Sequence, residues 1–331
     1  MTIPNFDPAA LEESIRKGLS AALIREEIPW EDGETAPLVL WVNGPLHVQG
    51  TDGQTVQIRG VGTSAHEEPH TIRINGPVHV VVPRTAHVDL ETVAGPVHVG
   101  GLEGGQVRWG KINGPLKVSA TQICVGENVG GPANFKNIGE RIEVASIHGP
   151  VLVTPCPPLV QLAQVHGPVR VHCPDPAGKR LVIHSTRSVV VKVPAETEVQ
   201  GTIRSTGQVQ VDLKQNENAS HQEAEVRLHA AHPERALTVE ITAGKQVYIG
   251  PNPPEISESA IGWELLEKLL NLFGAKGGRG EASAASEAAP RAAAAGADDE
   301  LRQARQRILR LLAEGKISLE DAERLLDALE P

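Results

Sequence analysis

The hexapeptide Asn43-Gly44-Pro45-Leu46-His47-Val48 recurs along this chain with small variations. Its clearest copies begin at Asn75, Ala94, Asn113, His148 and His166, and a fainter copy without the proline begins at Thr206. A phrase that returns so often is typical of a repeat protein, in which each copy forms the same small structural unit.

The spacing of the glycines defines the length of the unit. Gly76, Gly95 and Gly114 follow one another at 19 residues, and the longer gaps elsewhere are close to twice that length. Weaker copies are predicted near the middle of those gaps, at Gly60, Gly131-Pro132 and Arg187–Val191. About ten units of 16 to 20 residues then cover residues 38–212. A fixed period in this range predicts a solenoid.

Each unit carries the pattern of a half-buried strand. In the copy at Gly95, Val97 and Val99 are apolar and the residue between them, His98, is polar. Such alternation places every second side chain on one face. Glycine is expected to permit a positive φ at the corner, and proline to start a strand where no donor is needed. One unit has too little core to fold alone, so units must stack.

The fold class that follows is mainly β, a β-solenoid of about ten coils over residues 30–250. Neighbouring coils would lie about 4.8 Å apart, with their valines and leucines in continuous inner ladders. The alternation continues in Ala224–Ala230 and Ala236–Ile249, which are predicted to close the far end of the sheet. Aromatic residues make up only 2% of the chain, which suits a thin core built from aliphatic side chains.

Net charge, apolar runs and cysteine content narrow the possible binding partners and cellular location. The chain has 331 residues, a net charge of −10 and a pI near 5.7, which disfavour general affinity for nucleic acid or anionic lipid. No apolar run is long enough for a transmembrane helix, and no secretion signal is expected from the first ten residues. Three cysteines without CxxC spacing predict a reducing compartment, with neither a disulfide framework nor a zinc site. A cytoplasmic location is expected.

Helices are predicted at both ends of the solenoid. Residues 1–29 are assigned to an N-terminal cap, a helix that begins at Asp7-Pro8 and continues to about Glu27. A membrane-surface role for it is less favoured because its polar face is acidic. Residues 251–274 contain a second amphipathic helix, Ile261–Phe273, expected to pack on the far end of the solenoid, with partner or membrane contact as the alternative. Residues 275–297 are rich in Gly, Ala and Ser and predict a disordered linker.

Residues 298–331 predict a helical hairpin. Its first helix ends at Gly315, and Ser318 caps the second. Two such short helices cannot bury their own apolar faces, so the hairpin is predicted to bind a partner or another copy of itself. The apolar residues assigned to that contact are Ile308, Leu311, Leu312, Ile317, Leu319, Leu325, Leu326 and Leu329.

The segment Ile308–Leu326 resembles the short helical module of the YvlB/LiaX-type bacterial proteins. In those proteins the module accompanies an adhesin-type β-solenoid domain, so the resemblance extends in style to the repeat region. It implies a link to cell-envelope stress and no known active site. The module commonly lies at the N-terminus in that family, whereas here it is C-terminal.

The main candidate site is formed by the third residue after each corner glycine. His47, His79, His98, Lys117 and Arg170 should stack on one outward face. They could form a weakly basic, pH-sensitive stripe for an anionic partner such as a glycan or a phosphate group. The simpler interpretation is that outward strand positions tolerate polar residues. Metal binding by such a row is less favoured, because imidazoles in a row do not converge.

Two further sets of residues have structural explanations. The residues before the glycines, Asn43, Asn75, Asn113, His148 and His166, are predicted to be turn residues and could form an amide ladder. Cys156 and Cys173 lie one unit apart, and are expected to be buried or turn thiols rather than a redox pair.

No pattern of catalytic residues is evident. The glycines form no phosphate loop, and Asp89, Glu91, Glu103 and Glu143 are scattered. We therefore expect a non-enzymatic scaffold or interaction protein without cofactor, metal or small-molecule substrate. Its partners are expected to be proteins or further copies of itself, with no nucleic acid, and with peripheral membrane or envelope-protein association as a further option. The alternatives are a self-assembling filament of end-to-end solenoids and, less favoured, a carbohydrate-active β-helix enzyme.

Overall fold

A computed structural model describes residues 23–30, 36–68, 70–214, 219–221 and 225–253. The chain divides into two compact units, residues 1–277 and 278–331, and all described residues belong to the first. The elements within them are 22 strands of one open sheet, so the chain is mainly β as predicted. The hairpin at 298–331, the linker at 275–297, the helix Ile261–Phe273 and the first 22 residues lie outside the described residues.

The strands form two faces. One face, here called the entry sheet, holds the strands that lead into the corners. Its order in space is β5 (Thr63–Glu68), β6 (Thr71–Asn75), β2 (Leu38–Asn43), β8 (His87–Val93), the second halves of β9 (Val97–Ile112), β10 (Leu116–Val129) and β11 (Ala133–Ile147), then β13 (Leu159–Val165), β15 (Arg180–Ser185), β21 (Leu237–Ala243), β17 (Val199–Ser205) and β20 (Glu225–Leu228).

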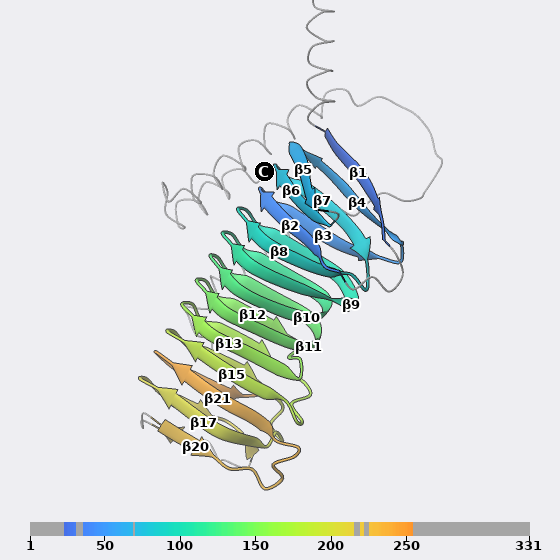
Figure 1. The fold of residues 1–331 in the computed structure, drawn as a ribbon. Helices are drawn as coiled ribbons and strands as arrows, with labels where there is room; N and C mark the ends of the chain where they lie inside the picture. Colours follow the sequence, from blue (N-terminus) through green and yellow to red (C-terminus); the bar gives the residue numbers. More distant parts are fainter. Residues whose placement is uncertain (1–22, 31–35, 69, 215–218, 222–224, 254–331) are drawn as a thin grey trace, which may run out of the picture. The chain divides into compact units, whose positions relative to one another are not determined.

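The other face, here called the exit sheet, holds the strands that leave the corners. Its order is β1 (Leu23–Pro29), β4 (Thr55–Val61), β7 (Val78–Pro83), β3 (Leu46–Thr51), the first halves of β9, β10 and β11, then β12 (Val151–Thr154), β14 (Val169–His172), β16 (Val189–Lys192), β22 (Val247–Gly250), β18 (Val209–Val211) and β19 (Ala219–His221). Figure 1 shows the labelled strands stacked one above another.

Parallel pairing joins ten coils in register, which is consistent with a β-solenoid. Each coil is one entry strand and the exit strand that follows its corner. In space they run β6–β7, β2–β3, β8–β9, β9–β10, β10–β11, β11–β12, β13–β14, β15–β16, β21–β22 and β17–β18. The corner at Gly131-Pro132 and the stretch Arg187–Val191 both belong to coils, as predicted. The prediction for Gly60 is wrong, because this residue lies in β4, which pairs antiparallel with β7.

The coils do not stack in the order of the sequence. β2 lies between β6 and β8, so the first Gly-Pro unit is the second coil in space. At the other end β21 lies between β15 and β17, and β22 lies between β16 and β18. In Figure 1 the orange strand β21 is accordingly seen between β15 and β17. The segment predicted to close the end of the sheet, Ala236–Ile249, is thus inserted into the stack.

The interior is a set of aliphatic ladders. Val97 and Val99 are 2% and 0% exposed, and Val97 lies between Leu46 and Leu116 of the neighbouring coils. The equivalent residues of the other coils are also buried, so the core continues through the stack. Each coil covers the apolar residues of the next, which is why the fold needs few large aromatic side chains.

The corner glycines are required by close stacking. A Cβ on Gly114 would lie 2.7 Å from the carbonyl carbon and oxygen of Gly95, and a Cβ on Gly95 would lie 2.7 Å from those of Gly44. Gly76 has the expected positive φ, 128°, but neither Gly95 nor Gly114 does, which corrects the expected reason for glycine at those two corners. The proline carbonyls continue the ladder: that of Pro115 accepts a hydrogen bond of 2.9 Å from the Val97 N–H.

Two of the three coils that lack the Gly-Pro phrase use serine at the corner. In the coil β15–β16 the Ser185 hydroxyl donates to the Gly167 carbonyl oxygen at 2.9 Å and accepts from the Arg187 N–H at 3.0 Å. Ser205 has the same two kinds of contact, with the Lys245 carbonyl and the Gly207 N–H. Each hydroxyl donates to a backbone carbonyl at the corner of the neighbouring coil, so the stack continues without proline.

Antiparallel strands close both ends of the described stack. β5 and β4 pair with the first coil, and β20 and β19 pair with the last. β1 then pairs with β4, which corrects the predicted helix over Leu23–Glu27. Ile24 and Trp30 are buried and Arg25 and Glu27 are exposed. This period of two suits a strand. A helix would leave the backbone N–H and C=O groups at the edge of β4 unpaired, whereas the strand β1 pairs with them.

Candidate interaction surface

The structure places the five candidate residues in one outward row of the exit sheet. In register, Arg59 is followed by His79, His47, His98, Lys117, Asn134, Leu152 and Arg170. We call these eight residues the exit row. His47, His79, His98, Lys117 and Arg170 are all partly exposed. The three histidines are direct neighbours, whereas Asn134 and Leu152 separate Lys117 from Arg170.

The three imidazoles form a stack along the coils. The ring centroids of His47 and His98 are 4.7 Å apart with an interplanar angle of 11°, and those of His47 and His79 are also 4.7 Å apart, at 36°. Burial lowers the pKa of all three, with neighbouring charges as the second cause, and brings the pKa of His98 to about 4. At neutral pH this part of the row is therefore uncharged, and the fixed positive charges are those of Arg59, Lys117 and Arg170.

Protonation of the imidazole stack should destabilise the fold. The folded-state pKa of these groups lies below 6.5, so the unfolded chain binds more protons as the pH falls. Stability is then undiminished above pH 6.5 and decreases between pH 6.5 and about 4. For His98, which is partly exposed, we expect a loss of about 2 kcal/mol after allowance for solvent screening.

Chemical denaturation at several pH values would measure this loss. The matched variant is His98→Asn, because asparagine occupies the same row at Asn134. The variant should lose less stability than the wild type between pH 6.5 and 4. An identical pH dependence in the two proteins would show that His98 does not contribute.

The residues before the glycines lie along one corner of the stack. The Asn43 amide donates to the Asn75 side-chain oxygen at 2.7 Å, so two of the predicted asparagines are joined. Ala94 follows Asn43 in space, which interrupts the predicted amide ladder before Asn113. The rings of His148 and His166 are 5.0 Å apart in adjacent coils. These contacts link neighbouring corners, as expected of turn residues.

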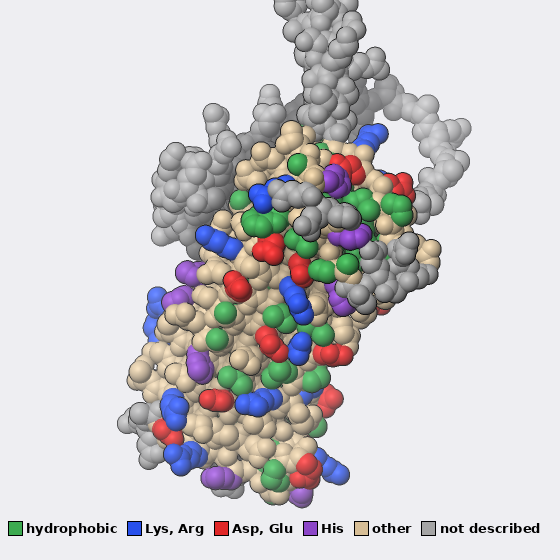
Figure 2. All heavy atoms as spheres, viewed as in Figure 1, with side chains coloured by type: hydrophobic (Ala, Val, Ile, Leu, Met, Phe, Trp, Pro, Cys, Tyr) green, Lys and Arg blue, Asp and Glu red, His purple; other side chains and the backbone are tan. Residues whose placement is uncertain are grey.

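Several described carboxylates pair with basic side chains. Arg84 contacts Asp52 at 3.1 Å and Glu103 at 3.7 Å, and Arg141 contacts Glu143 at 3.5 Å. Burial raises the pKa of Asp89, whose register neighbours are Val39 and Arg108. No group of three metal-ligating side chains is found in the described residues. Figure 2 shows acidic and basic side chains interspersed over the face in view.

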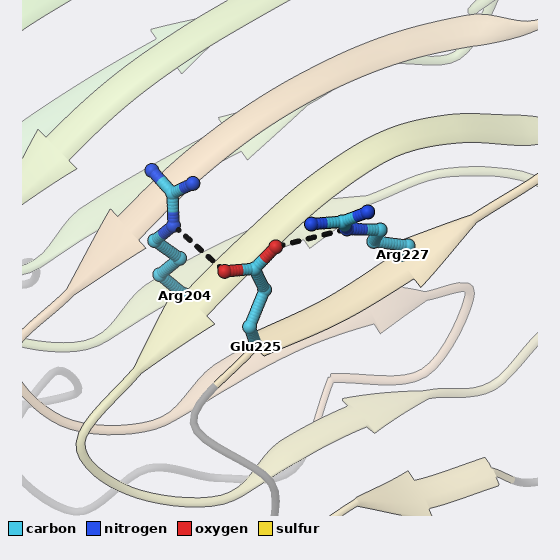
Figure 3. Close-up of polar contacts among 3 residues, drawn as sticks. All are labelled: Arg204, Glu225 and Arg227. Carbon is cyan, nitrogen blue, oxygen red and sulfur yellow. Dashed lines mark hydrogen bonds and ion pairs between the residues drawn. The ribbon is translucent and has the colours of Figure 1, made fainter.

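One charged cluster holds the edge strand β20 in place. Glu225 accepts from Arg204 of β17 at 3.2 Å and from Arg227 of its own strand at 2.9 Å (Figure 3). These bonds, Arg227 first, lower the pKa of the Glu225 carboxyl. The side chain thus ties the antiparallel edge strand to the last coil.

The variant Glu225→Gln should loosen this edge without unfolding the stack. The amide keeps the size of the side chain but removes the charge that both guanidinium groups share. Hydrogen exchange of residues 225–228 should speed up while that of β15 is unchanged, because edge strands open locally. Unchanged exchange in β20 would show that the backbone pairing alone holds it.

Sequence reasoning missed contacts that depend on which strands are neighbours. Glu26 of β1 bonds to Ser64 and, at 2.6 Å, to His66, both of β5. The Arg73 guanidinium carbon lies 4.5 Å from the centre of the Trp41 ring. The antiparallel strands and the displaced first coil create these pairs, and nothing in the repeat pattern indicates either arrangement.

The three cysteines are buried and free. Burial raises the pKa of Cys124, which is flanked by Val107 and Ile142. The thiols of Cys156 and Cys173 act on each other, and this interaction raises the pKa of Cys156 and lowers that of Cys173. Their 17-residue spacing is one unit of the repeat, and the structure places them in adjacent coils.

The candidate hairpin residues from Ile308 to Leu329 lie outside the described residues. The described part of the chain contains no helix that is long and apolar enough to span a membrane.

Comparison with known proteins gives partial matches. A family model described as a SHOCT-like domain matches residues 305–331. Among solved structures, a match is a "putative cell adhesion protein" from Clostridium sporogenes ATCC 15579, with 11% identity, covering 69% of this chain and 99% of that one. Its TM-score is 0.18, too low to support an argument about fold or function. No curated protein matches significantly. The matched C-terminal segment includes the hairpin residues singled out in the sequence, so this chain is similar to SHOCT-like proteins over its last 27 residues.

Proposed function

We propose that this chain is a non-enzymatic interaction protein, with the stack as a rigid scaffold and the exit row as its recognition surface for a protein partner. The C-terminal segment 298–331 would supply a second contact or self-association. The observation that carries this proposal is the unbroken register of the exit row across successive coils.

The geometry of the row suits a polypeptide partner. Side chains repeat about every 4.8 Å along the coils, which presents a long surface rather than a converging site. The uncharged imidazoles offer ring faces and hydrogen-bonding nitrogens, and Lys117 and Arg170 supply positive charge for carboxylates. An enzyme would instead bring its acids and bases together around one position.

The proposed setting is the bacterial cytoplasm, in the response to cell-envelope stress. The resemblance of Ile308–Leu326 to the helical module of the YvlB/LiaX-type proteins supports it. The SHOCT-like match to residues 305–331 covers the same segment.

The ends of the described stack disfavour a filament. Growth by end-to-end stacking needs bare parallel coils at both ends. Here antiparallel strands pair with the terminal coils. β1 carries exposed Arg25, Glu27 and Pro29, features that discourage further pairing at an edge.

The test compares the wild-type full chain with three double variants, by cross-linking and by capture of partners from bacterial lysate. The exit-row variant is Lys117→Glu with Arg170→Glu. Its matched control is Lys111→Glu with Arg180→Glu, which reverses two exposed charges on the entry sheet. The hairpin variant is Leu311→Asp with Leu326→Asp. Sedimentation measures self-association, and circular dichroism checks folding.

We expect a partner that is captured by the wild type and by the control and is lost with the exit-row variant. The hairpin variant should lose self-association or a separate partner. Identical capture by the exit-row variant and the wild type would refute the proposed surface. Turnover of an acidic glycan, abolished by a single carboxylate substitution, would refute the non-enzymatic assignment.

A further inference from the structure

Cys156 and Cys173 occupy the same position in adjacent coils. The Cys156 N–H donates to the His172 carbonyl at 2.8 Å, and the Cys173 N–H donates to the Lys192 carbonyl at 2.8 Å. In this parallel register the N–H of a residue donates to the carbonyl of the residue that precedes its register partner. Val151, for example, lies opposite Val169, and its N–H donates to the Pro168 carbonyl. Cys156 is therefore stacked directly on Cys173, and the next coil has Val193 at this position.

Both side chains face the core close to one cation. Cys156 and Cys173 are 2% and 0% exposed, and the two thiols shift each other's pKa, as groups close together do. The Cys156 sulfur lies 3.2 Å from the Pro157 carbonyl oxygen. The Lys179 ammonium donates to the Cys156 carbonyl oxygen at 2.7 Å, which places a positive charge beside the pair.

We propose that Cys156 and Cys173 form a two-coordinate site for a soft monovalent cation of the Cu⁺ or Ag⁺ type. Thiolates are the ligands that such cations prefer. On binding, each thiol releases its proton to solvent and forms one sulfur–metal bond. One cation and two thiolates carry a net charge of −1, which the Lys179 ammonium offsets, while the Asp175 carboxylate acts on Cys173 with the opposite sign. This site departs from the expectation of no metal and is independent of the proposed partner surface.

The stacking geometry favours a bridging cation over a disulfide. Directly paired side chains of parallel strands point the same way and are separated by roughly the strand spacing of 4.8 Å. A disulfide needs Cβ atoms about 3.5–4.5 Å apart. A linear sulfur–metal–sulfur unit with bonds of about 2.3 Å spans roughly 4.6 Å, close to the strand spacing.

The number of ligands favours a monovalent ion over zinc. Structural zinc requires four ligands. The described residues hold no group of three His, Cys, Asp or Glu side chains that could bind a metal. Two sulfurs without further ligands suit two-coordinate binding.

The test is titration of the reduced full chain with Cu⁺ under anaerobic conditions in the presence of a chromophoric Cu⁺ chelator, which suppresses weak surface binding. The variants are Cys156→Val and Cys173→Val, since Val193 shows that valine fits this row. The control is Cys124→Val, which removes a buried thiol that has no thiol neighbour. Thermal unfolding without metal checks that each variant folds.

We expect one Cu⁺ per wild-type and Cys124→Val chain, and loss of that equivalent in each of the other two variants. Lys179→Met should weaken binding about tenfold, as outer-shell changes do at metal sites. X-ray absorption should report two sulfur ligands. Absence of a stoichiometric equivalent in the wild type, its persistence in Cys156→Val or Cys173→Val, or its loss in Cys124→Val would overturn the proposal.

Discussion

Replacing Val97 by aspartate should destabilise the protein by at least about 4 kcal/mol, the scale of the largest single-residue effects. Val97 is 2% exposed and lies between Leu46 and Leu116 in the aliphatic ladder. A carboxylate there has no basic partner and loses its hydration, so the folded state must bury a charge or bind a proton. Because each coil relies on its neighbours, the damage should extend beyond one strand.

Chemical denaturation of the variant and the wild type would measure the loss. The control is Gln49→Asp, which places the same carboxylate at an exposed outward position of the neighbouring coil. Only the Val97 variant should lose substantial stability. Equal midpoints for Val97→Asp and Gln49→Asp would mean that the side chain of Val97 does not face the core.

Replacing Gly114 by alanine should cost about 3 kcal/mol, at the upper end of the range for overpacking. The added Cβ would meet the Gly95 carbonyl carbon and oxygen at 2.7 Å and the Pro96 nitrogen at 2.9 Å. All three are backbone atoms of the next coil, so no side-chain rotation relieves the contact. The two coils must separate, and their hydrogen bonds must lengthen.

Gly53→Ala is the matched control, because its Cβ would meet only the Thr51 hydroxyl oxygen, at 3.4 Å. Thermal unfolding should show a large decrease in the midpoint for Gly114→Ala and little change for Gly53→Ala. Similar midpoints for the two variants would contradict the steric explanation for glycine at the corners.

Much of the coil structure follows from the sequence because its determinants are local. The residues around Gly95 carry the alternation, the corner and the apolar pair within six positions. Gly131-Pro132 and Arg187–Val191 could be assigned to coils from spacing alone. The glycine requirement was predicted for a different reason, because a clash with Gly95 depends on a neighbouring coil that the local sequence does not reveal.

The order of the coils could not be predicted from the repeat. Every coil presents similar valine ladders, so the period does not specify which coil lies beside which. β21 pairs with both β15 and β17, although no motif distinguishes it from a closing strand. Gly60 lies near the middle of a gap, yet its strand runs antiparallel and closes one end of the stack.

The sequence predicts that the candidate residues form a row, but it does not predict the pKa values of their histidines. The two-residue alternation and the common corner place His47, His79 and His98 side by side. Their depressed pKa values arise first from burial and then from neighbouring residues of the exit row, which requires the register. The row is therefore less basic at neutral pH than its composition indicates.

The in-register stack with its inserted coil is tested most directly by methyl nuclear Overhauser effects among three buried isoleucines. Ile241 lies opposite Ile183 in β15 and opposite Ile203 in β17. The structure predicts contacts of Ile241 with both, and none between Ile183 and Ile203, which are two strands apart at roughly 10 Å. A direct Ile183–Ile203 contact, with Ile241 remote from both, would show that the coils stack in sequence order and would contradict the structure.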